Sequence, residues 1–358
     1  MRALRILAGP MALAHIRRQG LSASDVGVIP GAAGGPKGLV LGPLDRHLFG
    51  LWLPASSQPV HLVGASIGAW RLASACLKDP LNALGRLEHD YIHQDYRIPE
   101  GHKRPSAEQV SREFGQSLQG FYGGRVAEVL GHPRYRLHVV TSRGHHVLSR
   151  EGRWRTPLGY AGAYLSNALS RRWLGHWLSR VVFSARTDEP LPFATHDFAT
   201  ERVPLTEGNF MPAVQASCSI PFVLQAVHDI PMAPPGAHWD GGITDYHLHL
   251  DYRAQDRLVL YPHFQPQVVP GWLDKAWKRR HGATPFLDRM VLLCPSGDWI
   301  ARLPNAKLPD RNDFTTYAHD VPKRIRVWQA AAAAAEQLAE EWARWLRDPD
   351  PKRVEPLP

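Results

Sequence analysis

The chain has 358 residues, of which 44% are hydrophobic, so it can bury a large core and is expected to be globular. Its net charge of +9 favours anionic partners, and because no zinc-finger spacing or RNA-recognition signature is present, lipid is a better candidate than nucleic acid. Three widely separated cysteines argue against a zinc knuckle and a disulfide framework, which favours a reducing compartment.

The first residues imitate a secretory signal, because a basic start is followed by an apolar run over 6–14. Pro10 divides that run and leaves it short. No uncharged apolar stretch reaches the roughly 18 residues that a membrane-spanning helix needs. We therefore expect mature structure from the start of the chain, in a cytoplasmic protein that is soluble or peripherally attached to a membrane.

The first part of the chain alternates helical and strand patterns. In chain order, these patterns predict a helix over 9–19, a strand over 25–29, a glycine-rich loop over 30–38, a helix over 39–49, a strand over 60–63 and a helix over 67–77. Pro43 lies inside the second helix and should bend it, because proline removes a backbone hydrogen bond. Strand and helix in alternation predict an α/β fold of three layers, with a mainly parallel sheet between helices.

The remainder of the chain divides at residue 250. Residues 81–135 are polar and helical, which is typical of a covering or cap region within a core domain over 25–250. Residues 251–347 are predicted to pack on that core as a C-terminal extension. Further strands are predicted over 135–141, 258–261 and 290–294, and a final helix over 323–347. The apolar stripe of this helix, which we expect to dock on the core, consists of Trp328, Ala331, Ala335, Leu338, Trp342 and Trp345.

The segment Gly64-Ala65-Ser66-Ile67-Gly68 lies where the strand over 60–63 meets the helix over 67–77. A G-x-S-x-G turn in that setting is a nucleophile elbow, in which a strained serine projects toward substrate. Gly64 and Gly68 remove side chains that would otherwise clash at the turn. Ser66 is therefore the candidate nucleophile, and the alternative is a tight crossover whose small residues serve packing alone.

An acyl-transfer site also needs donors aimed at the developing negative charge. The segment Gly31-Ala32-Ala33-Gly34-Gly35-Pro36-Lys37-Gly38 can supply them, because glycines let backbone N–H groups converge and the following helix adds its positive end. A phosphate cradle and an ordinary glycine-rich turn are the alternatives. Neither Walker A nor dinucleotide-binding spacing can be written onto these residues, which argues against nucleotide binding.

A serine nucleophile needs a base within hydrogen-bond reach. Asp240 is the best candidate, because Gly241 and Gly242 follow it and permit a close backbone approach to another loop. The alternative for this short motif is an Asp-Gly turn that connects two strands.

Taken together, these motifs resemble the patatin-like phospholipases, which are lipid acyl hydrolases with a Ser-Asp dyad. The order agrees: a glycine-rich loop over 34–38, G-x-S-x-G over 64–68, A-S-x-x-x-P over 216–221 and Asp-Gly-Gly over 240–242. The resemblance covers about 25–250. It implies the patatin-like Ser-Asp hydrolase fold, Ser66 as nucleophile, Asp240 as base, and an oxyanion hole near Gly34, Gly35 and Lys37.

Two positions depart from the family pattern. Ala33 stands where the family has its first loop glycine, and Lys37 stands where it usually has arginine. Lysine keeps the positive charge but lacks the planar fork of arginine.

The expected function is hydrolysis of lipid carboxylic esters through an acyl-enzyme, without metal or cofactor. One alternative is a Ser-Asp-His triad that uses His247 or His263. Another is a catalytically silent lipid-binding or scaffold protein of the same fold. The paired histidines His145-His146 and His247-x-His249 lack a partner cluster and are interpreted as surface or strand residues.

A lipid substrate implies a membrane-contact patch that combines tryptophans with cations. Two segments have this composition, and the alternative for both is a solvated helix face with buried tryptophans. The first contains Trp272, Leu273, Trp277, Lys278, Arg279 and Arg280. The second contains Arg171, Arg172, Trp173, Trp177 and Arg180.

Overall fold

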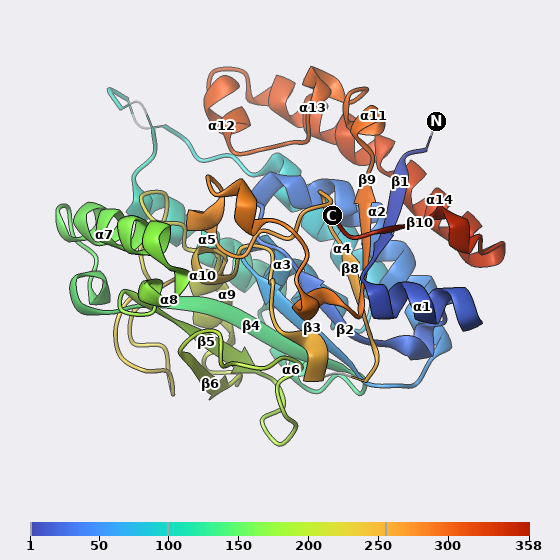
Figure 1. Ribbon diagram of the computed structural model, residues 1–358. Coiled ribbons are helices and arrows are strands. Elements are labelled where there is room, and N and C mark those ends of the chain that lie inside the picture. Colours follow the sequence, from blue (N-terminus) through green and yellow to red (C-terminus); the bar gives the residue numbers. More distant parts are fainter. Residues whose placement is uncertain (1, 99, 103, 255) are drawn as a thin grey trace.

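A ten-stranded sheet forms the centre of the molecule in the computed structural model, which describes residues 2–98, 100–102, 104–254 and 256–358. Nine strands follow the order β10-β1-β9-β8-β2-β3-β4-β5-β6 (Figure 1). β7 pairs with β4. Most pairs are parallel; β1–β9, β4–β5 and β4–β7 are antiparallel. The strands are β1 (Leu4–Ala8), β2 (Val26–Gly31), β3 (Val60–Ala65), β4 (Tyr135–Gly144), β5 (Leu178–Ser184), β6 (Thr200–Pro204), β7 (His238–Asp240), β8 (Leu258–Pro262), β9 (Met290–Pro295) and β10 (Val354–Pro356).

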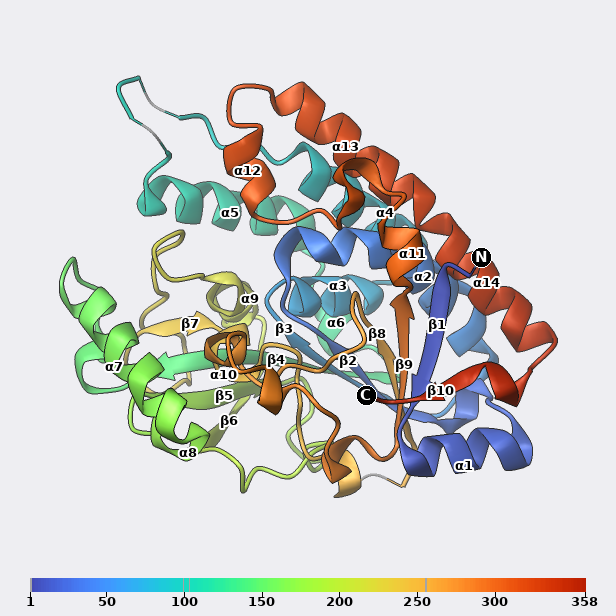
Figure 2. The ribbon, with the colours of Figure 1, turned by 45° about the horizontal axis from the view of Figure 1, so that its top comes forward.

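Helices flank this sheet, and α13 and α14 run across the helices of one face (Figure 2). The predicted α/β class with a mostly parallel, helix-flanked sheet is therefore confirmed. The α-helices are α1 (Pro10–Gln19), α2 (Gly42–His47), α3 (Ile67–Ala75), α4 (Pro80–His93), α5 (Ala107–Tyr122), α6 (Val126–Leu130), α7 (Arg155–Leu169), α8 (Arg171–Leu174), α9 (Phe210–Cys218), α10 (Gly242–Asp245), α11 (Gly297–Ile300), α12 (Asn312–Thr316), α13 (Val321–Ala334) and α14 (Glu336–Arg347).

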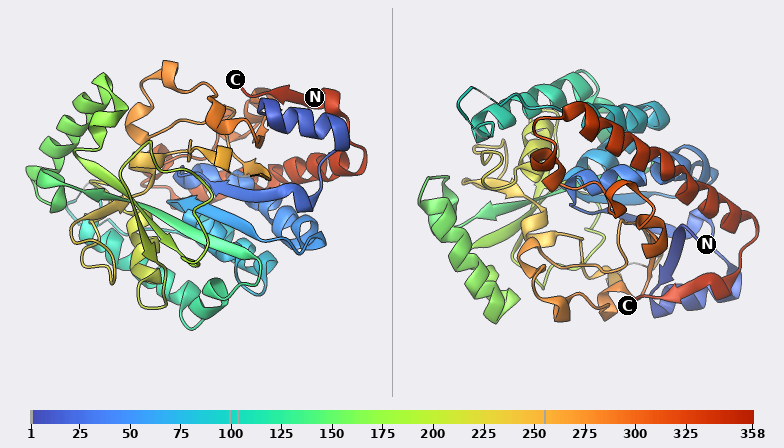
Figure 3. Two further views of the ribbon diagram at one scale, coloured as in Figure 1. Left: turned by 60° about the horizontal axis from the view of Figure 1, so that its bottom comes forward. Right: turned by 90° about the horizontal axis from the view of Figure 1, so that it is seen from above.

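The predicted elements with strong apolar patterns are present with small changes at their ends. α1, β2, β3, α3, β4, β8 and β9 all occupy the predicted positions. β1 was not predicted, because the apolar run over 6–14 was compared with a secretory signal and not interpreted as a strand. The strands β5, β6, β7 and β10 were not predicted either. β1 lies between β9 and β10, so the two ends of the described chain meet at one edge of the sheet (Figure 3).

Two predicted helices are interrupted. The helix over 39–49 is replaced by a 3₁₀ helix over Gly35–Leu41, then α2, then a π-helical turn over Leu48–Trp52. Pro43 lies in the first turn of α2, where a backbone N–H would have no acceptor within the helix, so its missing N–H costs no hydrogen bond. The final helix is divided at Ala335 into α13 and α14.

Residues 81–135 are helical, as predicted, and contain α4, α5 and α6 apart from the first residue of α4. Pro99 and Lys103 of this region lie outside the described residues. Residues after 250 contribute β8, β9 and β10 to the same sheet that contains β2 and β3. The stripe on the final helices is buried throughout, which confirms core docking. Among the described residues, no helix is long and apolar enough to cross a membrane.

Candidate active site

The registers of four neighbouring strands bring the predicted motifs together. Gly31, at the end of β2, pairs with Gly64 of β3, so the glycine-rich loop emerges beside the serine turn. On the other side of β3, Ala65 pairs with Val140 of β4. The next residue of β4, Thr141, pairs with Asp240 at the end of β7. Three segments far apart in sequence therefore meet at the carboxyl ends of β2 and β3, the edge where open α/β sheets bind ligands.

Ser66 occupies the strained turn between β3 and α3, with φ 56° and ψ −131°. An added Cβ at Gly64 would lie 2.4 Å from Ala69 Cα, and one at Gly68 would lie 1.9 Å from the carbonyl oxygen of Gly31. Both positions therefore require glycine, and the turn has the geometry of a nucleophile elbow.

Ser217, from the A-S-x-x-x-P segment, holds this turn in place. The Ser66 N–H donates to Ser217 Oγ at 2.9 Å, and Ser217 Oγ donates to the carbonyl of Val140 at 2.7 Å. Ser217 thus ties the strained turn to β4. The sequence pattern identified this segment but assigned its serine no role.

Asp240 faces the serine directly. The Ser66 hydroxyl donates to Asp240 Oδ2 at 2.7 Å, and the N–H of Gly242 donates to Asp240 Oδ1 at 2.7 Å. Gly241 is needed for this approach, because an added Cβ there would lie 2.1 Å from the carbonyl oxygen of Val140. The carboxylate is oriented by one hydroxyl and one backbone donor.

Burial raises the pKa of Asp240 above that of an ordinary aspartate. The positive charge of Arg311 opposes this rise most strongly, followed by the hydrogen bonds from Ser66 and Gly242 and the charge of Lys275. Burial and the neighbouring cations Arg311 and Lys37 lower the pKa of Lys275 to about 8. Asp240 is therefore a buried carboxylate whose raised pKa is partly offset by nearby cations.

The glycine-rich loop lies next to Ser66 and presents donors of the required type. Gly34 sits against Phe264, where an added Cβ would approach the ring to 2.5 Å. Gly35 has φ 56°, a left-handed conformation that favours glycine. Within the described chain, the N–H groups of Gly34 and Gly35 donate to no acceptor, whereas the N–H of Ala33 donates to the carbonyl of Tyr246 at 3.0 Å. The two glycines can therefore donate to a ligand.

Lys37 and Gly38, the other two residues of the predicted oxyanion hole, pack against the side chains of Phe264 and Ile67. The Lys37 ammonium lies over the Phe264 ring at 5.3 Å, and its pKa is lowered by burial. Gly38 packs closely on Ile67, the residue after the serine, where an added Cβ would meet the Ile67 side chain at 3.3 Å. Gly38 thereby sets the distance between the loop and α3.

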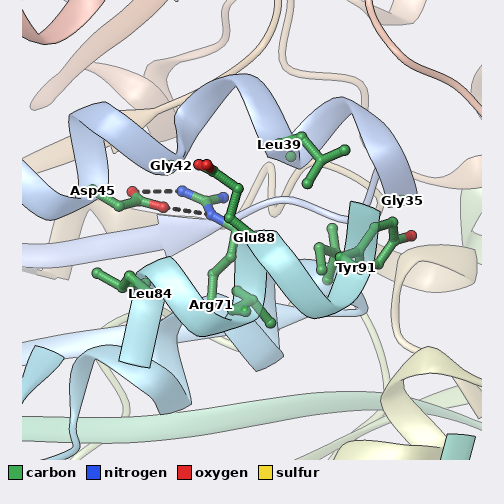
Figure 4. A pocket seen from close by; sticks show the side chains of 11 residues that line it. Gly35, Leu39, Gly42, Asp45, Arg71, Leu84, Glu88 and Tyr91 are labelled. Atoms are coloured by element: carbon green, nitrogen blue, oxygen red, sulfur yellow. Dashed lines mark hydrogen bonds and ion pairs between the residues drawn. The ribbon is translucent and has the colours of Figure 1, made fainter. Parts of the chain in front are cut away.

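A buried ion pair fixes the helix after this loop to the helix after the serine. Arg71 of α3 donates from Nε and Nη2 to the two carboxylate oxygens of Asp45 in α2, both at 2.7 Å (Figure 4). Both side chains are buried. Such a two-point contact is geometrically demanding, so it holds the loop and the elbow in one arrangement.

Ser66 and Gly35 line a cavity of about 830 Å³. Its walls come from α4, α5, the segment after α9 and the residues around α12, so the predicted covering region forms one side of it. The apolar and aromatic lining residues include Ile67, Trp70, Tyr91, Tyr96, Ile98, Val110, Phe114, Ile220, Phe222, Val223, Leu224, Phe314, Tyr317 and Val321. The cavity is wide enough for a drug-sized or lipid-sized ligand.

Two residues beside the serine were missed by sequence reasoning. Arg311 precedes α12 and lies close to Gly35, where an added Cβ would be 3.3 Å from Arg311 Nε. Within the described part of the chain it forms no ion pair, and no motif surrounds it that could have identified it. Cys218 lines the cavity next to Ser66, but burial raises the pKa of its thiol well above the usual range. The thiol is therefore protonated and is a weak rival nucleophile.

The candidate triad histidines do not contact the dyad. His247 and His263 are buried with ring centroids 4.4 Å apart, and their Nδ1 atoms lie near the carbonyls of Gln267 and Gln265. Burial lowers the pKa of His263 to about 3 and also lowers that of His247. Since the Ser66 hydroxyl donates its hydrogen bond directly to Asp240, the geometry gives no support to a histidine base. In the described regions, no group of three or more His, Cys, Asp or Glu side chains is arranged to hold a metal ion.

The two proposed membrane patches are altered by the structure. Arg180 is fully buried and pairs with Asp197 and Asp245, so including it in a surface patch was wrong. Arg171 and Arg280 both pair with the buried Asp274. The members of the two patches that are exposed are Arg172, Trp173, Lys278 and Arg279.

No protein-family model matches this chain, and no curated protein matches it. The function is therefore inferred from the site.

Proposed function

We propose that this protein is a serine-dependent lipid acyl hydrolase with a patatin-like fold, which cleaves carboxylic esters through a Ser66–Asp240 dyad. The observation that carries the proposal is the 2.7 Å hydrogen bond from the Ser66 hydroxyl to Asp240 at a strained elbow. A nucleophile and base at this distance, next to free backbone donors, are the parts that acyl transfer needs.

The reaction proceeds in two halves. Asp240 accepts the Ser66 proton as Oγ attacks the ester carbonyl, and the N–H groups of Gly34 and Gly35 stabilise the oxyanion. The carbonyl re-forms, the C–O bond to the alcohol breaks, and Asp240 returns the proton to the departing alcohol. Asp240 then accepts a proton from water, whose oxygen attacks the acyl-serine. Collapse of this second intermediate releases the carboxylic acid and returns the proton to Ser66.

The cavity supports a long-chain substrate. Its volume of about 830 Å³ and the aromatic and aliphatic part of its wall suit an acyl chain, because apolar surface leaves water favourably, and charged residues such as Arg97, Arg104 and Arg311 line the rest. Ser66 lines the same cavity, so a chain bound there presents its ester to the nucleophile. Unpaired cysteines agree with a reducing compartment, and we place the enzyme in the cytoplasm, with peripheral access to lipid.

A catalytically silent lipid-binding protein is the second candidate. It is favoured by one observation: the N–H of Ala33, at the first loop position, is occupied by the carbonyl of Tyr246. A protein with the cavity but without turnover would bind fatty acid and leave esters intact.

Covalent labelling distinguishes these candidates. The protein is treated with a long-chain fluorophosphonate, and the adduct is located by mass spectrometry in wild type, Ser66→Ala and Asp240→Asn. We expect labelling at Ser66 that both substitutions abolish. Labelling that persists in Asp240→Asn would reveal another base, and no labelling of wild type, combined with fatty-acid binding, would indicate the silent protein.

A further inference from the structure

Helix α7 exposes apolar side chains on its outward face. It lies at the edge of the molecule, away from α13 and α14 (Figure 2). Trp154 is 73% exposed, Leu165 is 65% exposed, and Leu158, Leu169 and Trp173 are similarly uncovered. Trp154, Leu158, Leu165 and Leu169 are spaced four, seven and four residues apart, so their side chains form one stripe along the helix.

The inward face of the same helix has a single large side chain, Tyr160, among small and polar residues. Thr156, Gly159, Tyr160, Ala163 and Asn167 are buried, and Asn167 donates to the buried Asp274 at 2.9 Å. A surface helix normally has the reverse arrangement, with its large apolar residues turned to the core. Folding of this domain therefore does not explain the exposed stripe.

Exposed arginines stand at both ends of the stripe. Arg150, Arg153 and Arg155 lie near the start of α7, and Arg172 lies just beyond its end. Glu151 is the single acidic residue between positions 150 and 187. Arginines at a helix N-terminus oppose the helix dipole, so their placement does not serve the stability of α7.

Helix α7 also contacts the wall of the cavity that contains Ser66. The ring of Tyr160, on the buried face of α7, meets the Phe222 ring edge to face, with centroids 6.1 Å apart. Phe222 is 49% exposed, adopts φ 69°, and lines the cavity together with the similarly exposed Val223. The helix that carries the stripe therefore packs beside exposed apolar residues of the cavity wall.

We propose that the outward face of α7 docks on an anionic lipid membrane, with its arginines at the headgroups and its apolar stripe below them. Tryptophan and leucine suit the boundary between headgroups and acyl chains, and arginines are attracted to anionic lipid. Docking in this position brings the cavity wall at Phe222 to the bilayer surface, where a lipid can enter without crossing water.

A second copy of the chain fits the stripe less well. Because arginines lie at both ends of α7, parallel and antiparallel pairing of two α7 helices would each bring like charges together. An anionic membrane has the complementary charge at both ends.

Vesicle flotation tests the proposal. Wild type is mixed with vesicles of phosphatidylcholine containing about 30% phosphatidylserine, or with phosphatidylcholine alone, at low and physiological salt. We expect binding to the anionic vesicles to fall at least about tenfold in the double variant Leu158→Glu/Leu165→Glu. Leu51→Glu is the matched control, because Leu51 is also 65% exposed but lies outside α7, and it should bind like wild type.

Two further variants separate the contribution of the arginine charges to binding from the effect of catalysis. Replacing Arg153, Arg155 and Arg172 with glutamine should weaken binding at low salt and remove most of its salt dependence. Ser66→Ala should bind vesicles like wild type, so loss of catalysis and loss of docking can be told apart.

Three results would overturn the proposal. They are the absence of wild-type binding to either vesicle, equal binding by Leu158→Glu/Leu165→Glu, and equal loss in Leu51→Glu. A dimer in light scattering that the α7 double variant converts to a monomer, without vesicle binding by wild type, would instead identify a second copy as the occupant.

Discussion

Asp240 and Asp45 are both buried carboxylates next to the serine helix α3, but their surroundings differ. Arg71 meets Asp45 with two hydrogen bonds of 2.7 Å, which neutralise its charge in a fixed geometry. Asp240 receives only the Ser66 hydroxyl and the Gly242 N–H. Its nearby cations act through space, and no salt bridge to it exists in the described chain.

This difference agrees with a structural role for Asp45 and with the proposed catalytic role of Asp240. Burial without a directly paired cation raises the affinity of a carboxylate for a proton. The raised pKa of Asp240 agrees with its proposed role as general base, whereas the two-point contact with Arg71 gives Asp45 a structural role. Substituting Asp240 and Asp45 one at a time tests these two roles separately.

The largest expected effect is on turnover in Asp240→Asn. The amide cannot accept the serine proton, so kcat for a soluble p-nitrophenyl ester should fall about 10⁴-fold. Thermal unfolding should change little, because the substitution leaves no buried charge without a partner. Activity within tenfold of wild type would contradict the assignment of Asp240 as the base.

Asp45→Asn should lower the stability of the fold, whereas Asp240→Asn should lower turnover with little change in stability. It leaves the Arg71 guanidinium buried without a counter-charge, which costs about 3–5 kcal/mol in the free energy of unfolding. Urea denaturation measures this loss. The double variant Asp45→Leu/Arg71→Met removes both charges and should recover much of the stability. Equal unfolding midpoints for wild type and Asp45→Asn would show that the pair is not structural.

Gly34→Ala tests the loop that the ion pair supports. The new methyl group would lie 2.5 Å from the Phe264 ring, so the loop must shift and move its N–H donors. Loss of one oxyanion donor lowers kcat by about 100 to 1,000-fold, and we expect an effect in that range. Gly297→Ala is the control, because a Cβ there meets nothing within 4 Å. Equal kcat values for both variants would exclude this loop as the oxyanion hole.

The sequence predicted the parts of the site that depend on local backbone chemistry. Gly64 and Gly68 are needed because β3, α3 and the end of β2 approach one another closely, and that requirement is visible as a motif. The strands that position these parts, β2, β3 and β4, were predicted from their apolar runs.

The remaining parts depend on contacts between distant segments. Arg311 reaches Gly35 from a segment without any pattern, and Phe264 supports Gly34 from the loop after β8. The exposed stripe on α7 was not predicted, apart from Trp173, which belonged to one of the two candidate membrane patches, and the exposure of the other residues follows only from the structure. Burial, rather than residue type, also distinguished Arg180 from the arginines at the surface.

Substitutions of Arg311 test how its charge tunes Asp240, because Arg311 is the cation that most lowers the pKa of Asp240. The base works in its ionised form, so kcat/KM should fall as the pH drops through that pKa. Arg311→Met removes the opposing charge and raises the pKa of Asp240, which moves the acidic limb of the profile to higher pH.

The loss of activity in Arg311→Met should therefore be greatest at low pH and smallest on the alkaline side, where Asp240 is ionised in both proteins. Arg311→Lys keeps the charge and should restore the wild-type limb. Lys275→Met should shift the limb less, because Lys275 contributes least among the groups that lower the pKa of Asp240. A pH-independent loss in Arg311→Met would assign Arg311 to substrate contact, and Asp240 would then owe its ionisation to Ser66 and Gly242.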